Sequence, residues 1–131
     1  GFLPQEQINS FLRTAKLAIF PYRMDINNLV YGASGAIRHA MSCGVPVIAS
    51  KSHLFDDLEG VVPRVDDYVY LAEEIDKIFS NGEYRQKLIS LNLEFVRNHT
   101  WDIEADQSIL AYKNIIDKFY EDSVLIDHPE P

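Results

Sequence analysis

The sequence contains one cysteine among its 131 residues, and this scarcity limits the chemistry available to it. A lone thiol, Cys43, forms no disulfide within the chain, which fits a reducing cytoplasm. Runs of about 18 apolar residues are also missing, so we expect no transmembrane segment. The first residues do not resemble the charged and then apolar leader of a secreted protein. We therefore predict a cytoplasmic protein.

Lysine and arginine are scarce as well: the chain has 12 of them against 20 aspartates and glutamates, giving a net charge of −8. A nucleic-acid-binding domain needs a basic surface for the phosphates, so we exclude nucleic acid as a partner. No cluster has metal-ligand spacing. The four histidines are scattered along the chain as His39, His53, His99 and His128. The sequence thus predicts neither a metal nor a cofactor.

At 131 residues the chain is expected to form one domain that buries roughly two-thirds of its unfolded surface. It begins with Gly1 rather than Met and enters a predicted helix at residue 4, so we expect a piece cut from a longer protein. The domain is predicted over residues 1–122. The tail over residues 123–131 contains two prolines and is expected to be flexible.

The stretch over residues 31–50 carries the strongest local pattern. Gly44 is placed where a helix ends in the left-handed conformation, and Val45–Ala49 reads as a short buried strand. A small-residue loop, a helix and a strand in this order are typical of a parallel α/β sheet. Ser34 is a good N-cap for the helix, and apolar residues follow it at helical spacing: Ala36, Ile37, Ala40 and Met41.

The loop before this helix consists of small residues, which leaves backbone N–H groups uncovered at the positive end of the helix dipole. The N–H groups of Ala33, Ser34 and Gly35 would suit an anion, and phosphate is the usual one. The alternative is that the small residues only let the helix pack closely on the sheet. The local sequence supports both interpretations equally.

The remaining elements alternate in the same way, and Pro63 suggests that the last strand lies at a sheet edge. We predict an α/β fold of the Rossmann-like type, in which a short parallel sheet lies between helices in three layers. Three strands are few for such a sheet, so half of the Rossmann-like domain is expected to be missing. The expected elements span residues 4–16, 17–20, 34–43, 45–49, 55–59, 61–65, 67–80, 83–98 and 100–120.

The loop over residues 22–33 follows the first predicted strand and is long for a compact domain. Long loops at the carboxyl ends of parallel strands are usually functional. Arg23 is the basic candidate here for reaching a ligand. A solvated connector is the alternative. The loop is rich in side chains that form hydrogen bonds: Arg23, Asp25, Asn27, Asn28 and Tyr31.

Three features, in order along the chain, carry a family resemblance. Ala15–Pro21 matches a strand that ends in proline. His39–Ala49, with the sequence HAMSCGVPVIA, is similar to a signature helix and strand that typically ends EAMAxGxPVIA. Late in the chain, Trp101, Ala105 and Tyr112 match a pattern of tryptophan, three variable residues, alanine and a following tyrosine. Over nearly its whole length the chain therefore resembles the C-terminal part of a GT-B glycosyltransferase of the group 1 retaining family.

Two glutamates that are usual in that family, with seven residues between them, are replaced here. One contacts the donor sugar and the other the nucleotide ribose, and they align with Tyr31 and His39. A neutral His39 still has a hydrogen-bond donor and an acceptor, so the resemblance makes it a candidate ribose contact. The alternative is a plain helix residue. Ser34-Gly35 resembles a variant in which some members replace the first glutamate.

The resemblance implies a glycosyltransferase that moves a sugar from a nucleotide-diphosphate sugar to an unknown acceptor. This chain would supply the donor-binding half. Ala33, Ser34 and Gly35 would hold the diphosphate, and Arg23, Tyr31 and His39 are further candidates beside the donor. The acceptor-binding N-terminal domain would precede Gly1, and a membrane-peripheral location stays open for the full-length enzyme. Alone, the chain is expected to be inactive and to self-associate through its open sheet edge.

Two other classes stay open. A catalytically inactive relative, kept as an interaction or regulatory domain, would explain the missing glutamates. An unrelated phosphate-binding module, such as a flavodoxin-like receiver, needs an acidic cluster at its strand ends. The strand ends here read Pro21-Tyr22, Ser50-Lys51 and Val65-Asp66, which argues against a receiver.

Overall fold

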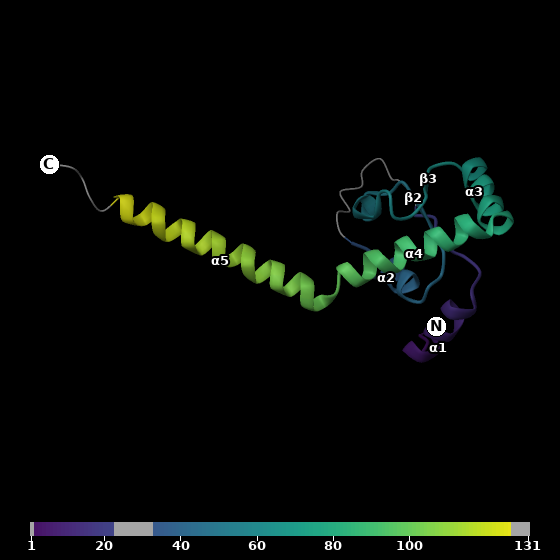
Figure 1. Cartoon of the computed structure of the whole chain (residues 1–131), viewed down its shortest axis with the longest axis horizontal. Helices are drawn as coiled ribbons and strands as arrows, with labels where there is room; N and C mark the ends of the chain where they lie inside the picture. Colours follow the sequence, from purple (N-terminus) through teal and green to yellow (C-terminus); the bar gives the residue numbers. More distant parts are fainter. Residues whose placement is uncertain (1, 23–32, 127–131) are drawn as a thin grey trace. The chain divides into compact units, whose positions relative to one another are not determined.

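The chain folds as a mixed α/β protein, in which the helices outnumber the strands of one short sheet (Figure 1). The structure is a computed structural model, and it describes residues 2–22 and 33–126, with side chains as far as residue 120. The chain divides into two compact units, residues 1–97 and residues 98–131. In order, the elements are α1 (Gln5–Thr14), β1 (Ala18–Phe20), α2 (Gly35–Ser42), β2 (Val47–Ser50), the 3₁₀ helix η1 (His53–Leu58), β3 (Arg64–Val65), α3 (Tyr68–Ser80), α4 (Gly82–Asn98) and α5 (Trp101–Ile126).

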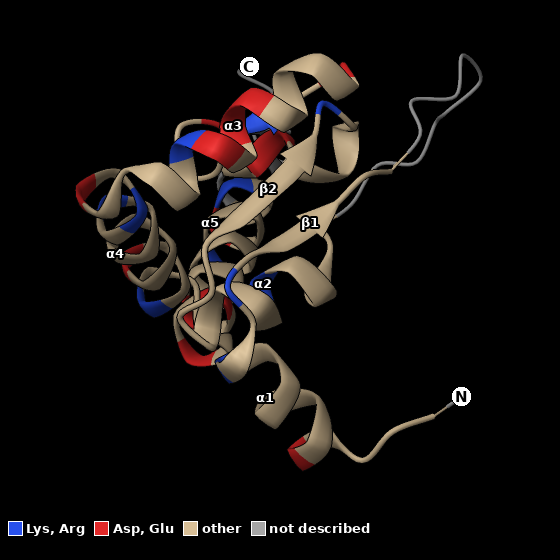
Figure 2. Ribbon diagram, turned by 90° about the vertical axis from the view of Figure 1, so that its right-hand side faces the viewer, with Lys and Arg blue, Asp and Glu red and all other residues tan. Residues whose placement is uncertain are grey.

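The sheet is parallel, and its strand order β1-β2-β3 follows the chain. Figure 2 shows β1 and β2 side by side and running in the same direction, with Ile19 opposite Ile48 in the register. On the other side of β2, Ala49 lies opposite Arg64. β3 is therefore an edge strand of this sheet, as Pro63 predicts. The parallel α/β architecture predicted from the sequence is confirmed.

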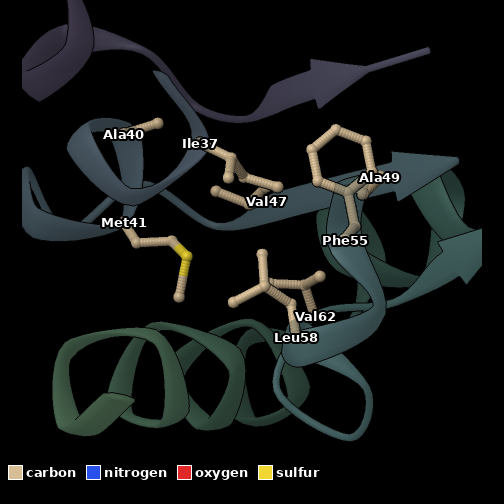
Figure 3. Packing of buried hydrophobic residues seen from close by; sticks show 8 residues of the cluster. All are labelled: Ile37, Ala40, Met41, Val47, Ala49, Phe55, Leu58 and Val62. Atoms are coloured by element: carbon tan, nitrogen blue, oxygen red, sulfur yellow. The ribbon is translucent and has the colours of Figure 1, made fainter. Parts of the chain in front are cut away.

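Strand β2 is buried on both faces. Val47 and Ala49 belong to one apolar cluster with three residues of α2 and with η1, which Figure 3 shows converging on a common centre. Ile48 belongs to a second cluster with Ile78 of α3 and Leu88 of α4. Because neighbouring residues of a strand point to opposite faces, these two clusters place helices on both sides of the sheet. The cluster in Figure 3 consists of Ile37, Ala40, Met41, Val47, Ala49, Phe55, Leu58 and Val62.

Two strands are shorter than the sequence suggests. β2 begins at Val47 rather than Val45, although the carbonyl oxygen of Pro46 still accepts a hydrogen bond from the Ala18 N–H at 3.0 Å. β3 was expected over residues 61–65 but contains only Arg64–Val65. Gly60, with a φ of 76°, turns the chain back, so that the N–H of Val61 bonds the Leu58 carbonyl at 3.0 Å. That turn uses the backbone groups that a longer strand would need.

The helix boundaries also correct one expectation. Asn81 connects α3 to α4, and its side chain accepts a hydrogen bond from the Tyr84 N–H at 2.9 Å at the start of α4. Helix α5 runs to Ile126, past its predicted end near residue 120 and into the segment predicted as a flexible tail from residue 123. Residues 127–131 lie outside the described part of the chain. Among the described helices, none is long and apolar enough to cross a membrane.

Gly44 ends α2 with a φ of 74°, the left-handed conformation predicted from the sequence. A Cβ added there would meet no heavy atom within 4 Å, so the glycine is required by its backbone conformation rather than by space. We expect Gly44→Ala to lower the free energy of unfolding by about 1–2 kcal/mol, measured by urea denaturation.

Gly82 provides the matched control for this substitution. It is the first residue of α4, lacks a positive φ, and also has open space around the position of an added Cβ. Gly82→Ala should leave the free energy of unfolding unchanged or raise it slightly, since alanine favours helices. Equal losses for the two variants would show that backbone conformation is not the reason for glycine at position 44.

Candidate functional site

Within the part of the chain that the structure describes, the start of α2 is accessible, as an anion site requires. Ser34 is the N-cap with extended φ and ψ of −79° and 113°, but its side chain makes no capping hydrogen bond. The first turn of α2 contains no acidic residue. Ala33, Gly35 and Ala36 are exposed and Ser34 is half-buried. Among the described residues, the backbone N–H groups of the first turn therefore have no hydroxyl cap from Ser34 and no carboxylate within the turn.

Arg38 lies beside the start of α2. In the structure one guanidinium nitrogen donates to the Ser34 carbonyl at 3.3 Å, and another pairs with Asp57. The guanidinium also lies over the ring of Phe95 in α4, 5.8 Å from its centroid. Its long side chain reaches back one turn, so Arg38 links the N-cap of α2 to η1 and to α4.

His39 contacts α1 rather than open space. Its Nε2 lies 2.6 Å from the Oδ1 of Asn9 and 3.0 Å from the amide nitrogen of Gln5. The same Gln5 nitrogen lies 3.4 Å from Nδ1. Both ring nitrogens thus have partners within the chain. This arrangement favours the alternative of a helix residue, while the ribose contact stays a prediction.

The role of His39 can be tested through its coupling to Asn9. We expect His39→Ala and Asn9→Ala each to destabilise the chain, and the double variant to lose about 0.5–1.5 kcal/mol less than the sum. The free energies of unfolding come from urea denaturation of the four proteins in a double-mutant cycle. Strictly additive losses would mean that the hydrogen bond contributes nothing to stability.

Two of the six predicted site residues, Arg23 and Tyr31, lie outside the described residues. The structure brings Ala33, Ser34 and Gly35 together at the start of α2, and His39 follows in the same helix on the side of α1. Within residues 2–22 and 33–120, no group of three histidine, cysteine, aspartate or glutamate side chains could hold a metal ion.

A pocket of about 410 Å³ lies at the carboxyl ends of the three strands and was not predicted. Its lining combines residues that follow the strands within two positions, Tyr22 and Asp66, with Tyr68 and Leu71 from the first turn of α3. The sequence does contain a signal for it: the same three strand ends that argue against a receiver also meet at one edge of a parallel sheet. The remaining lining residues are Ile19, Pro21, Ile48, Ala49, Ser50, Val65 and Asp67.

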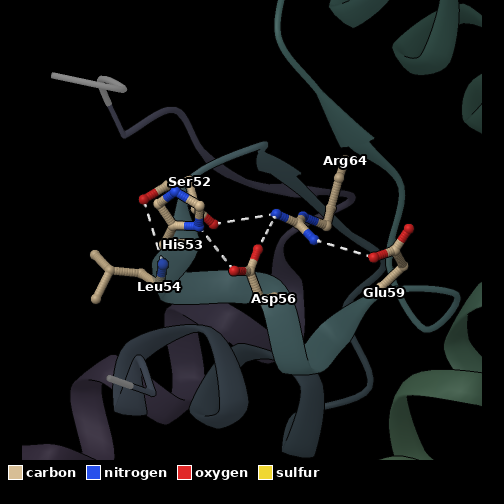
Figure 4. Close-up of polar contacts among 6 residues, drawn as sticks. All are labelled: Ser52, His53, Leu54, Asp56, Glu59 and Arg64. Atoms are coloured by element: carbon tan, nitrogen blue, oxygen red, sulfur yellow. Dashed lines mark hydrogen bonds and ion pairs between the residues drawn. The ribbon is translucent and has the colours of Figure 1, made fainter. Parts of the chain in front are cut away.

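A second polar group joins η1 to β3 and is drawn in Figure 4. Arg64, whose side chain is 13% exposed, donates to Asp56 at 2.6 Å and to the Ser52 carbonyl at 3.2 Å. His53 lies 2.8 Å from the other oxygen of Asp56. The hydrogen bond from His53, and then that from Arg64, lowers the pKa of the Asp56 carboxyl. Since these bonds connect segments of the chain to one another, we interpret the group as structural.

The pH dependence of stability should report this group. With its pKa lowered on folding, the Asp56 carboxylate stabilises the fold above the unfolded-state value, and the contribution is lost as the pH falls through the folded-state value. We therefore expect stability to decline below about pH 5, and Asp56→Asn to be less stable at neutral pH and to show a smaller decline. Thermal unfolding measured between neutral and acidic pH tests this.

Glu59→Gln is the control for that measurement. Glu59 also faces Arg64, but at 3.8 Å and with a side chain that is 86% exposed. Its variant should keep the acid-dependent loss of stability. An unchanged pH profile in Asp56→Asn would contradict the assigned role of Asp56.

Comparisons of the chain with protein-family models, with curated proteins and with solved structures found no match. The functional assignment therefore depends on the residues and the geometry alone.

Proposed function

We propose that this chain is the donor-binding half of a glycosyltransferase of GT-B type, which transfers a sugar from a nucleotide-diphosphate sugar to an acceptor. The acceptor would be held by a second domain. The observation that carries the proposal is the unit over residues 39–49, which resembles the signature of that family. It forms a helix end, a left-handed glycine at position 44 and the central buried strand.

The start of α2 supports the proposal chemically. In such a transfer, negative charge develops on the departing diphosphate, and stabilising that charge is the chief electrostatic task. Backbone N–H groups at a helix start suit this task because they point along the helix axis towards the anion. Ser34 makes no capping bond, and the first turn of α2 has no carboxylate that would repel a phosphate.

A catalytically inactive relative is the second candidate, and one contact favours it. His39 stands where the family has the glutamate that binds the ribose, and its ring nitrogens bond Asn9 and Gln5 of α1. A nucleotide that used His39 would have to displace these partners. An inactive relative kept for interaction with another protein would not need this contact. The two candidates differ in whether a nucleotide sugar binds at all.

Gly35→Pro tests the diphosphate site directly. Gly35 is the first residue of α2, and Ser34 before it already has the extended conformation that proline requires of its neighbour. The substitution therefore removes one N–H while leaving the helix in place. We expect the affinity for UDP- and GDP-sugars, measured by calorimetric titration, to fall by roughly tenfold or more, since hydrogen bonds to charged groups contribute about 1.5–3 kcal/mol.

Gly35→Ala is the matched control because it keeps the N–H and adds a methyl group in open space. It should bind the nucleotide sugars as the parent does, and circular dichroism should show all three proteins folded. Equal affinities for the parent and the proline variant would rule out a phosphate role for this N–H. A parent that binds neither sugar nucleotide would favour the inactive relative.

A further inference from the structure

Helix α5 is exposed as far as residue 120, the last residue whose side chain is described. It runs from Trp101 to Ile126 within the second compact unit of the chain, residues 98–131. All residues from 101 to 120 are exposed, and nine of them are large and apolar. Helices in proteins obtain most of their stability by packing an apolar face against another element. The exposed apolar residues of α5 therefore indicate a surface that binds a partner.

Apolar residues recur along one side of α5 at alternating steps of four and three residues. Because a helix turns about 100° per residue, five such positions lie within roughly 80° of one another around its axis. The spacing is that of the seam along which two helices pack in a coiled coil. The seam of α5 consists of Ala105, Ile109, Tyr112, Ile116 and Phe119.

The area of this apolar face suits a stable interface. Four aromatic side chains lie on the seam or directly beside it, and between 65% and 92% of each is exposed. Since one aromatic side chain can bury about 150–250 Å², the four offer roughly 400–700 Å² together. Each partner in a standard interface buries about 800 Å², and the half-exposed isoleucines of the seam supply much of the remainder. The aromatic residues are Trp101, Tyr112, Phe119 and Tyr120.

The charges of α5 are divided along its length, which determines the orientation of a partner helix. Residues 101–112 contain three acidic residues and no basic one, whereas residues 113–120 contain two lysines and one aspartate. Two parallel copies would place the acidic halves beside each other. An antiparallel pair places each acidic half beside the basic half of the other copy, and it also opposes the two helix dipoles. The acidic residues of the first half are Asp102, Glu104 and Asp106.

One antiparallel register satisfies both the seam and the charges. When residue 101 of one copy faces residue 120 of the other, Ile109 lies opposite Tyr112 across the seam. Asp106 and Lys113 are seven residues apart, nearly two full turns, and so lie on the same flank of the helix. In this register Asp106 of each copy lies beside Lys113 of the other. The pair occurs twice because the two copies are related by a twofold axis.

We propose that α5 is a self-association surface, through which two copies of the chain pair in antiparallel orientation with their seams buried. Asp106 of each copy then faces Lys113 of the other. This inference is independent of the proposed function, and it assigns self-association to α5 rather than to the open sheet edge. A membrane surface is a poorer partner, because acidic residues outnumber basic ones by four to two over residues 101–120 and anionic lipids would repel them.

Sedimentation equilibrium of the whole chain over a range of concentrations tests the pairing. We expect a reversible dimer, and Ile116→Asp should raise its dissociation constant about a hundredfold or more, because a carboxylate in the seam would be buried without a partner. Leu110→Asp is the matched control. Leu110 lies in the same helix and is 60% exposed, against 51% for Ile116, but it points about 140° away from the centre of the seam.

The control should change the dissociation constant less than about twofold. Circular dichroism establishes that each variant is folded. A chain that is monomeric at every concentration would overturn the inference, and so would equal effects of the two substitutions. A dimer that keeps its affinity in Ile116→Asp would use another surface, such as the open edge of β1, which also overturns it.

Exchanging the charges tests the antiparallel register. Asp106→Lys and Lys113→Glu should each weaken the dimer about tenfold, because each substitution converts two attractive pairs into two repulsive ones. The double variant should regain the affinity of the parent, since it restores both pairs with their signs exchanged. Single variants that dimerise as the parent does, or a double variant no stronger than either of them, would rule out this register.

Discussion

The burial of strand β2 on both faces is the constraint on which the rest of the sheet depends. Val47 and Ala49 need a cover on one side and Ile48 on the other, because each buried apolar side chain contributes about 1.5–3 kcal/mol only if water is excluded. Helix α2 with η1 supplies the first cover, and α3 with α4 supplies the second. Asn92 of α4 adds a buried hydrogen bond from its amide to the Val45 carbonyl at 3.3 Å, just before the strand.

The same constraint determines where ligands can bind. With helices on both faces of a parallel sheet, the chain must leave each strand at its carboxyl end and turn into the next helix there. The start of α2 and the pocket beside α3 both lie where the chain leaves a strand and enters a helix. They belong to opposite faces of the sheet, since α2 packs with Val47 and α3 with Ile48. A ligand that used both would extend across the strand ends.

The sequence predicts the elements well where local chemistry and burial agree. Gly44 has its predicted left-handed conformation, and Pro63 precedes an edge strand as expected. Prediction fails where tertiary contacts decide. Phe79 is 57% exposed although its neighbour Ile78 is buried, because adjacent residues of a helix point about 100° apart and only Ile78 faces the sheet. Likewise, no local pattern shows that Arg38 reaches Ser34 or that His39 meets Asn9 across two helices.

The distribution of charge distinguishes the start of α2 from the pocket beside α3. The chain carries a net charge of −8, yet the first turn of α2 has no acidic residue, while Asp66 and Asp67 line the pocket beside α3. A phosphate would be disfavoured at the acidic rim and favoured at the helix start, where the dipole is positive. An uncharged group with hydroxyls would experience the opposite preference, since its hydroxyls donate to carboxylates. Charge alone therefore favours an anion at the start of α2 and an uncharged hydrogen-bond donor beside α3.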